Sequence, residues 1–233
     1  MSTAPDYPLA LAIEDFVPVL LTSYAVLLLR RITGSRWTVV AAALIGAGGI
    51  AKASAKLVVA AGGPDLPWLR GALFPLLTLG FALLYAELIR ASTGRIARWF
   101  LVGAPALIAV CAVGALVAAD TLPMLVSTTV FATMTGIHLI GMARRRGDLP
   151  AAVLIGIQLL AFFVLGALGA RPDQPVALQW VEQLTNTAAQ AAFLIAVVRL
   201  TTPRSGVTDS AGAGADSDRG SGGPIAPGRR SAS

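Results

Sequence analysis

The sequence predicts an all-α integral membrane protein: a bundle of seven transmembrane helices, with the N-terminus outside and the C-terminus in the cytoplasm. Composition is the first reason. Hydrophobic residues make up 56% of the chain and charged residues 13%, whereas a soluble domain carries about 25% charged residues. The second reason is a series of apolar runs of membrane-spanning length, and the third is the placement of arginine between those runs.

The apolar runs define the spans in order. A helix needs roughly 20 apolar residues to cross a bilayer. Runs of about that length lie at residues 9–29, 38–61, 68–89, 97–118, 121–142, 149–169 and 176–199. We therefore expect residues 1–200 to form one seven-helix transmembrane domain. Residues 201–233 are rich in Gly, Ser, Ala and Pro and have no apolar period, which predicts a disordered cytoplasmic tail.

Individual spans carry further signals. Pro18, Pro75 and Pro105 fall inside spans one, three and four and predict bends, because proline cannot donate the helical hydrogen bond. Span one is interrupted by Glu14 and Asp15 and has no basic residue before it, as expected of an uncleaved first helix rather than a signal peptide. Small residues predict close helix packing in spans two and six. These residues are Ala43, Ala47, Ala51, Ala55, Gly46, Gly48 and Gly49 in span two, and Gly156, Gly166 and Gly169 in span six.

Arginine placement predicts the orientation. Arginines occupy alternate connections and the segment after the last span: Arg30, Arg31, Arg36, Arg90, Arg95, Arg98, Arg144, Arg145, Arg146, Arg199 and Arg204. The other connections carry Asp65 with Arg70, Asp120, and Arg171 with Asp173. Cytoplasmic loops are enriched in Lys and Arg, so the excess of arginine behind the pI near 10.4 indicates the topology of the protein. We therefore expect no nucleic acid as a partner. We expect a multi-pass protein of the cell membrane, in the simplest case a bacterial plasma membrane, with the lipid bilayer as its partner.

The lysines mark a candidate polar site. Lys52 and Lys56 are the only lysines of the chain, and both lie in span two. They are one helical turn apart in a segment where charge is costly, which indicates that an ammonium group is required there. For Lys56, which is near the helix end, snorkelling to the external interface is the alternative.

Span seven carries a polar stripe. Gln179, Glu182, Gln183, Asn186 and Gln190 recur at three- and four-residue intervals and cover roughly a 100° arc of the helix. Gln190 lies about 12 Å deeper than Glu182. Polar side chains are disfavoured against lipid, so the arc is expected to face the bundle interior as a cavity wall. Interhelical hydrogen bonding without a ligand is the alternative.

The charged residues of spans one, two and seven are expected at similar depths in the membrane. With span one running inward and span two outward, Glu14, Asp15, Lys52, Lys56 and Glu182 all fall in the outer half of the membrane. We take Glu14, Lys52, Lys56, Glu182, Asn186 and Gln190 as the candidate ligand-binding residues. The order of the helices around the bundle decides whether they meet, and the sequence does not predict that order.

The inner half offers weaker candidates. Glu87 lies three residues before Arg90, which predicts an ion pair at the cytoplasmic edge. His138 is the single histidine, and one histidine is a poor metal site because even catalytic zinc has three protein ligands. The chain has no GxSxG, HExxH or Walker motif and no Cys–His set. We therefore expect no metal, no cofactor and no catalytic residues of a known kind.

Three functions remain open, and only the third of them is enzymatic. The first is binding or transport of a small polar or zwitterionic solute in a cavity open to the external side. The lysines would then meet an anionic group, and Glu14, Glu182, Asn186 and Gln190 a cationic or hydroxylated one. The second is an interaction subunit or sensor with a membrane-protein partner. The third is a membrane-embedded enzyme acting on a lipid or isoprenoid, with Glu182 and Lys52 as its acid–base pair.

Overall fold

The computed structural model describes residues 9–169 and 176–203, with side chains as far as Leu165 in the first range. All regular secondary structure in these residues is α-helical. The helices are α1 (Leu9–Glu14), α2 (Phe16–Leu28), α3 (Arg30–Thr33), α4 (Arg36–Ala60), α5 (Pro67–Gly71), α6 (Leu73–Thr93), α7 (Arg98–Ala118), α8 (Leu122–Arg145), α9 (Leu149–Gly169) and α10 (Val176–Thr201). The predicted tail falls almost entirely outside the described residues.

The helices are consistent with a multi-pass membrane protein. In the described residues, six segments are long and apolar enough to cross a bilayer: Leu9–Thr33, Arg36–Ala60, Pro67–Thr93, Arg98–Ala118, Leu122–Arg145 and Val176–Thr201. The part of α9 whose side chains are described, Leu149–Leu165, is also apolar. The chain thus has the helices of a multi-pass membrane protein, while the seventh span and the orientation stay predictions.

Prolines explain two interruptions. The first span breaks at Asp15 between α1 and α2, three residues before Pro18, and the third breaks at Ala72 between α5 and α6, three residues before Pro75. Each break falls in the turn that a proline deprives of a hydrogen bond. The fourth span behaves differently, because α7 continues through Pro105 without interruption.

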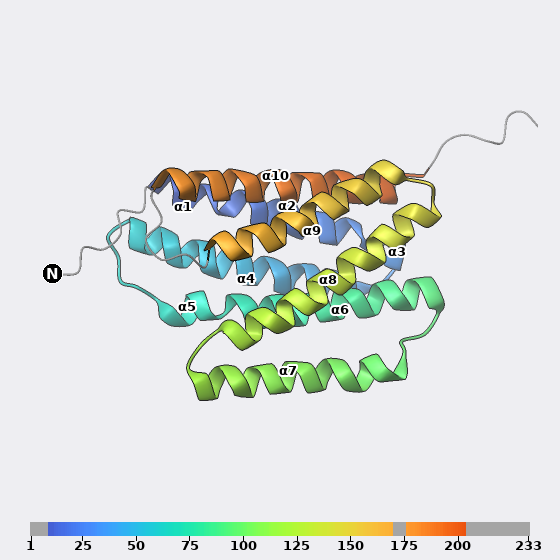
Figure 1. Ribbon diagram of the computed structural model, residues 1–233, viewed down its shortest axis with the longest axis horizontal. Coiled ribbons are helices and arrows are strands. Elements are labelled where there is room, and N and C mark those ends of the chain that lie inside the picture. The colour runs from blue at the N-terminus through green and yellow to red at the C-terminus, as the bar shows by residue number, and fades with distance from the viewer. Residues whose placement is uncertain (1–8, 170–175, 204–233) are drawn as a thin grey trace, which may run out of the picture. The chain divides into compact units, whose positions relative to one another are not determined.

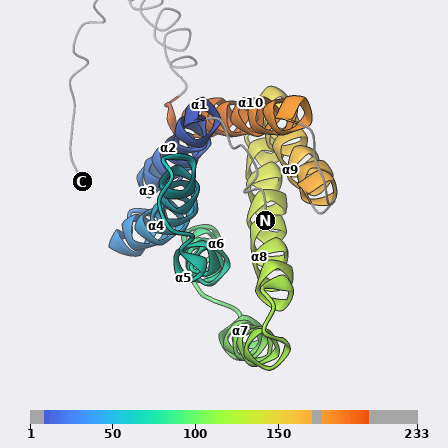
Figure 2. The same cartoon turned by 90° about the vertical axis from the view of Figure 1, so that its left-hand side faces the viewer.

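The helices form a ring, an arrangement that the sequence did not predict. Contacts join α2 to α4, α4 to α6, α6 to α8, α8 to α9, α9 to α10, and α10 back to α2. Helix α7 lies outside this ring, against α8 and α6 (Figures 1 and 2). The end of α1 is therefore next to both α4 and α10, which carry the candidate site residues.

Glycines set the closest approaches between helices. A Cβ atom at Gly46 would lie 2.8 Å from Ser23 Oγ, and one at Gly49 would lie 2.6 Å from Val19 Cγ2, so α4 packs directly on α2. On another side of α4, a Cβ atom at Gly48 would lie 3.0 Å from the carbonyl oxygen of Leu73. The predicted close packing of span two is thus made mainly by its glycines. Of the predicted alanines, Ala55 is buried, while Ala43 and Ala47 are exposed.

The two ends of the ring contain different kinds of side chain in the interior. We call the end where α6 and α8 finish the arginine end, and the end where α4 finishes and α10 begins the lysine end (Figure 1). Toward the arginine end, the interior is a continuous apolar core with contributions from all six ring helices, including Leu29, Ile45, Leu88, Leu139, Ile155 and Leu200. The polar candidates lie toward the other end.

Candidate functional site

The break in the first span separates two adjacent carboxylates. Asp15 Oδ2 lies 2.6 Å from Nζ of Lys56 on α4, and only 12% of the Asp15 side chain is exposed. Thr187 Oγ1 on α10 donates a hydrogen bond of 2.5 Å to Glu14 Oε1. Consecutive residues thus bind different neighbours, as side chains about 100° apart on a helix can. The first span is fastened to both sides of the ring at the lysine end.

Lys52 faces the interior of the ring. On an α-helix, residues seven and eleven apart share a face, so Lys52 continues the line of the buried Ala41 and Ile45. Yet the Lys52 side chain is exposed. It lies within electrostatic range of Lys56, Asp15 and Glu182. The burial along this line of α4 therefore ends at Lys52, toward the lysine end.

Glu182 occupies the corresponding position on α10. It is seven residues before Ala189, eleven before Phe193 and eighteen before Leu200, which are all buried. These spacings place Glu182 on the core-facing side of α10. Lys52 and Glu182 therefore point into the same part of the ring from α4 and α10.

Asn186 and Gln190 have a different environment. Gln190 Nε2 lies 3.4 Å from Asn186 Oδ1, and Gln190 Oε1 lies 2.8 Å from the hydroxyl of Thr22 on α2. That hydroxyl also lies 2.8 Å from the carbonyl oxygen of Pro18, and its single proton can serve only one acceptor fully. In this deeper part of the stripe, Gln190 thus bonds α10 to α2. This contact fits the alternative interpretation of the stripe, in which its side chains make interhelical hydrogen bonds.

The structure therefore divides the candidate residues into two groups. Glu14, Lys52, Lys56 and Glu182 come together at the lysine end, whereas Asn186 and Gln190 lie at the α2–α10 contact. Sequence reasoning gave Asp15 the right depth but left it out of the candidate list, and it missed Thr187. Thr187 lies four residues after Gln183 and so continues the polar stripe of span seven. The stripe was defined by amides and carboxylates alone, which left this hydroxyl out.

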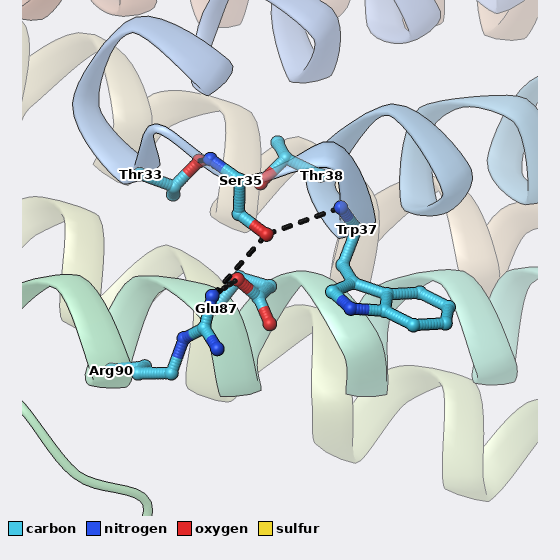
Figure 3. A network of polar contacts seen from close by, with 6 residues as sticks. All are labelled: Thr33, Ser35, Trp37, Thr38, Glu87 and Arg90. Carbon is cyan, nitrogen blue, oxygen red and sulfur yellow. Dashed lines mark hydrogen bonds and ion pairs between the residues drawn. The ribbon is translucent and has the colours of Figure 1, made fainter.

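A second polar network lies at the arginine end (Figure 3). Arg90 Nη2 lies 3.0 Å from Oε2 of the buried Glu87 and 3.4 Å from Ser35 Oγ. Ser35 is the N-cap of α4 and accepts a hydrogen bond from the backbone N–H of Trp37 at 3.1 Å. The predicted Glu87–Arg90 pair is thus present, and its partner Ser35 gives it a structural role: it joins α6 to the start of α4.

Two further polar contacts at the arginine end also join neighbouring helices. Asp148 Oδ1 accepts hydrogen bonds from Arg199 Nε and Nη2 at 3.2 and 3.1 Å and from the backbone N–H of Ala151 at 3.2 Å. It therefore caps α9 and binds α10 to it. His138 Nε2 lies 3.2 Å from Ser92 Oγ, and its ring meets that of Tyr85 edge-on. In the part of the chain that the structure describes, no group of three His, Cys, Asp or Glu residues is placed to hold a metal ion.

Comparison of the chain with protein-family models, with curated proteins and with solved structures finds no match. The functional argument therefore depends on the geometry of the site.

Proposed function

We propose that the protein binds or transports a small polar or zwitterionic solute inside the ring at the lysine end, which the arginine distribution predicts to face outward. The single observation that carries the proposal is the position of Lys52, an exposed residue, on the core-facing line of α4. A charge in that position requires water or a polar ligand, since charged side chains within membranes face polar interiors rather than lipid.

The surrounding charges support a ligand with both signs. Lys56 is committed to Asp15 at 2.6 Å, so Lys52 is the ammonium group assigned to an anionic group of the solute. Glu182, on the facing line of α10, and Glu14, at the α1–α10 contact, are assigned to its cationic or hydroxylated part. Gln190 holds α10 against α2 through Thr22 and bonds to Asn186 on its own helix, so these two amides act on the solute through that support.

The apolar core at the arginine end supports binding from the lysine end. Its buried residues come from all six ring helices and fill the interior of the ring on that side. Transport would require this core to open, whereas binding alone would not. Flux and binding measurements therefore distinguish the two forms of the proposal.

The test uses the full chain reconstituted in lipid nanodiscs and in proteoliposomes. Binding of amino acids and betaines to nanodiscs is measured by calorimetry, and uptake of the same radiolabelled solutes is measured in proteoliposomes. We expect saturable binding by the wild-type protein and at least a tenfold loss in Lys52→Met. Arg70→Met is the matched control, since Arg70 pairs with Asp65 in an exposed position. Absence of saturable binding by wild-type protein would refute the proposal.

A further inference from the structure

The short turn between α3 and α4 brings together arginines from three helices. Gly34 has φ 64°, a left-handed conformation that suits glycine, and only two residues separate α3 from α4. Arg30 and Arg31 lie before the turn on α3, and Arg36 begins α4 directly after it. Helix α3 also contacts α6, whose last turn carries Arg90. We call Arg30, Arg31, Arg36 and Arg90 the turn patch.

The positive charge of the turn patch is largely uncompensated. All four arginines are exposed. Glu87 pairs with Arg90, whereas no salt bridge in the described residues joins Arg30, Arg31 or Arg36 to a carboxylate. Four positive charges and one negative charge give the patch a net charge of +3.

Other arginines at the same end have structural partners. Arg199 pairs with Asp148, and Arg146 donates a hydrogen bond to the carbonyl oxygen of Leu200. These contacts fasten α10 to its neighbours. The general enrichment of cytoplasmic ends in basic residues accounts for arginines at this end, but it does not account for guanidinium groups that are both exposed and held in place.

Two arginines of the turn patch are held in this way. Nη2 of Arg90 lies 3.0 Å from Glu87 Oε2 and 3.4 Å from Ser35 Oγ (Figure 3), while 49% of the Arg90 side chain is exposed. The guanidinium carbon of Arg36 lies 5.7 Å from the centroid of the Trp37 ring, a cation–π arrangement. A guanidinium group that is already positioned loses less conformational freedom when it binds an oxyanion.

Trp37 indicates the depth at which the turn patch lies. Its side chain is 46% exposed, and it is the second residue of a segment that can cross a bilayer. Tryptophan is enriched at the membrane–water interface, at the level of the lipid headgroups. Phosphate is the oxyanion found at that level, and arginine binds it through the planar fork of its N–H groups. The net positive charge favours a lipid whose headgroup is negatively charged.

We propose that the turn patch binds the headgroup of an anionic phospholipid in the leaflet at the arginine end. Arg36 and Arg90 donate hydrogen bonds to phosphate oxygens, and Arg30 and Arg31 add electrostatic attraction. Trp37 lies beside the glycerol region of the lipid. This site is independent of the solute site at the lysine end, so failure of either proposal leaves the other standing.

The experiment measures lipid binding to the purified full chain by native mass spectrometry, with phosphatidylglycerol as the anionic lipid and phosphatidylcholine as the zwitterionic one. The wild-type protein should bind phosphatidylglycerol about fivefold more tightly or more, and Arg36→Gln should remove about a fivefold preference. This change corresponds to about 1 kcal/mol, the contribution of one basic residue at an anionic membrane surface. Arg144→Gln is the matched control, because Arg144 is an exposed arginine at the same end outside the turn patch. It should change the affinity by less than about twofold, since it acts only through a screened charge.

A double variant separates an ordered site from simple attraction of charge. Glu87→Gln with Arg90→Gln leaves the net charge unchanged and leaves no carboxylate unpaired, but it removes the positioned guanidinium group. It should weaken binding of phosphatidylglycerol as Arg36→Gln does. Unchanged affinity in this double variant, equal affinity of the wild type for both lipids, or equal losses in Arg36→Gln and Arg144→Gln would overturn the proposal. Displacement of phosphatidylglycerol by inorganic phosphate at equal concentration would assign the turn patch to free phosphate and would also overturn it.

Discussion

Nζ of Lys56 and Oδ2 of Asp15 lie 2.6 Å apart and join α4 to the break in the first span. The pair is largely shielded, since the side chains are 25% and 12% exposed. Glu14, the preceding residue, accepts a hydrogen bond from Thr187 of α10. The ion pair and this hydrogen bond together fasten the end of α1 between α4 and α10.

Removal of Lys56 should destabilise the protein. Lys56→Met leaves Asp15 as an unpaired carboxylate in a shielded position, and breaking a buried pair from one side costs about 3–5 kcal/mol; we expect the lower part of that range because Lys56 is partly exposed. The double variant Lys56→Met with Asp15→Asn should recover most of the loss. Thermal unfolding in detergent checks both, with Arg70→Met expected to change stability by less than about 1 kcal/mol. A Lys56→Met protein as stable as Arg70→Met would mean that Lys56 only snorkels.

Lys52 should behave in the opposite way. Its side chain is already exposed, so Lys52→Met should leave the melting temperature nearly unchanged while reducing solute binding at least tenfold. Parallel melting and calorimetry of Lys52→Met and Lys56→Met compare the two roles. Equal loss of stability in both variants would contradict the separation.

Several of these features could be predicted from the sequence because they depend on local pattern or on depth. Apolar run lengths predict the spans, Pro18 and Pro75 predict the breaks, and alternating helix direction brings Glu14, Lys56 and Glu182 to one level. The pairing of Asp15 with Lys56 depends on the neighbours of α1, and helix order around the ring is decided by packing between segments distant in sequence. The same limit applies to Gly156, which was expected at a close helix contact but has no atom within 4 Å of an added Cβ.

Glycine substitutions should report the close contact between α4 and α2. Gly49→Ala places a methyl group 2.6 Å from Val19 Cγ2 and should destabilise the protein by about 1–3 kcal/mol, as overpacking does. Gly156→Ala meets open space and should be neutral or slightly stabilising, because alanine favours a helix over glycine. Thermal unfolding of the two variants tests this. Similar effects in both would mean that α4 and α2 are further apart than the structure places them.

The arginine-end contact of Asp148 should contribute to stability rather than to binding. Asp148→Asn keeps an acceptor for the cap of α9 but removes the charge opposite Arg199, whereas Asp148→Ala removes both interactions. We expect Asp148→Ala to lower stability more than Asp148→Asn, by about 1 kcal/mol for the lost cap. Solute affinity should stay within about twofold of wild type, because the lysine end is unchanged. Selective loss of binding in Asp148→Asn, with the melting temperature preserved, would place part of the site at the arginine end.

The orientation of the ring in the membrane is the premise on which entry from outside depends. The arginine-bearing connections that follow α6 and α8 emerge at the same end of the ring (Figure 1), so a single labelling experiment determines the direction of all helices.

The native Cys111 is first replaced by alanine, and single cysteines are introduced at Asp65 and at Arg145. A membrane-impermeant maleimide added to intact cells should label the cysteine at position 65 and leave the one at position 145 unlabelled until the cells are opened. The expectation follows from the enrichment of basic residues in cytoplasmic loops. Labelling of position 145 in intact cells would place the lysine end in the cytoplasm, and any solute bound by Lys52 would then be drawn from the cytoplasm.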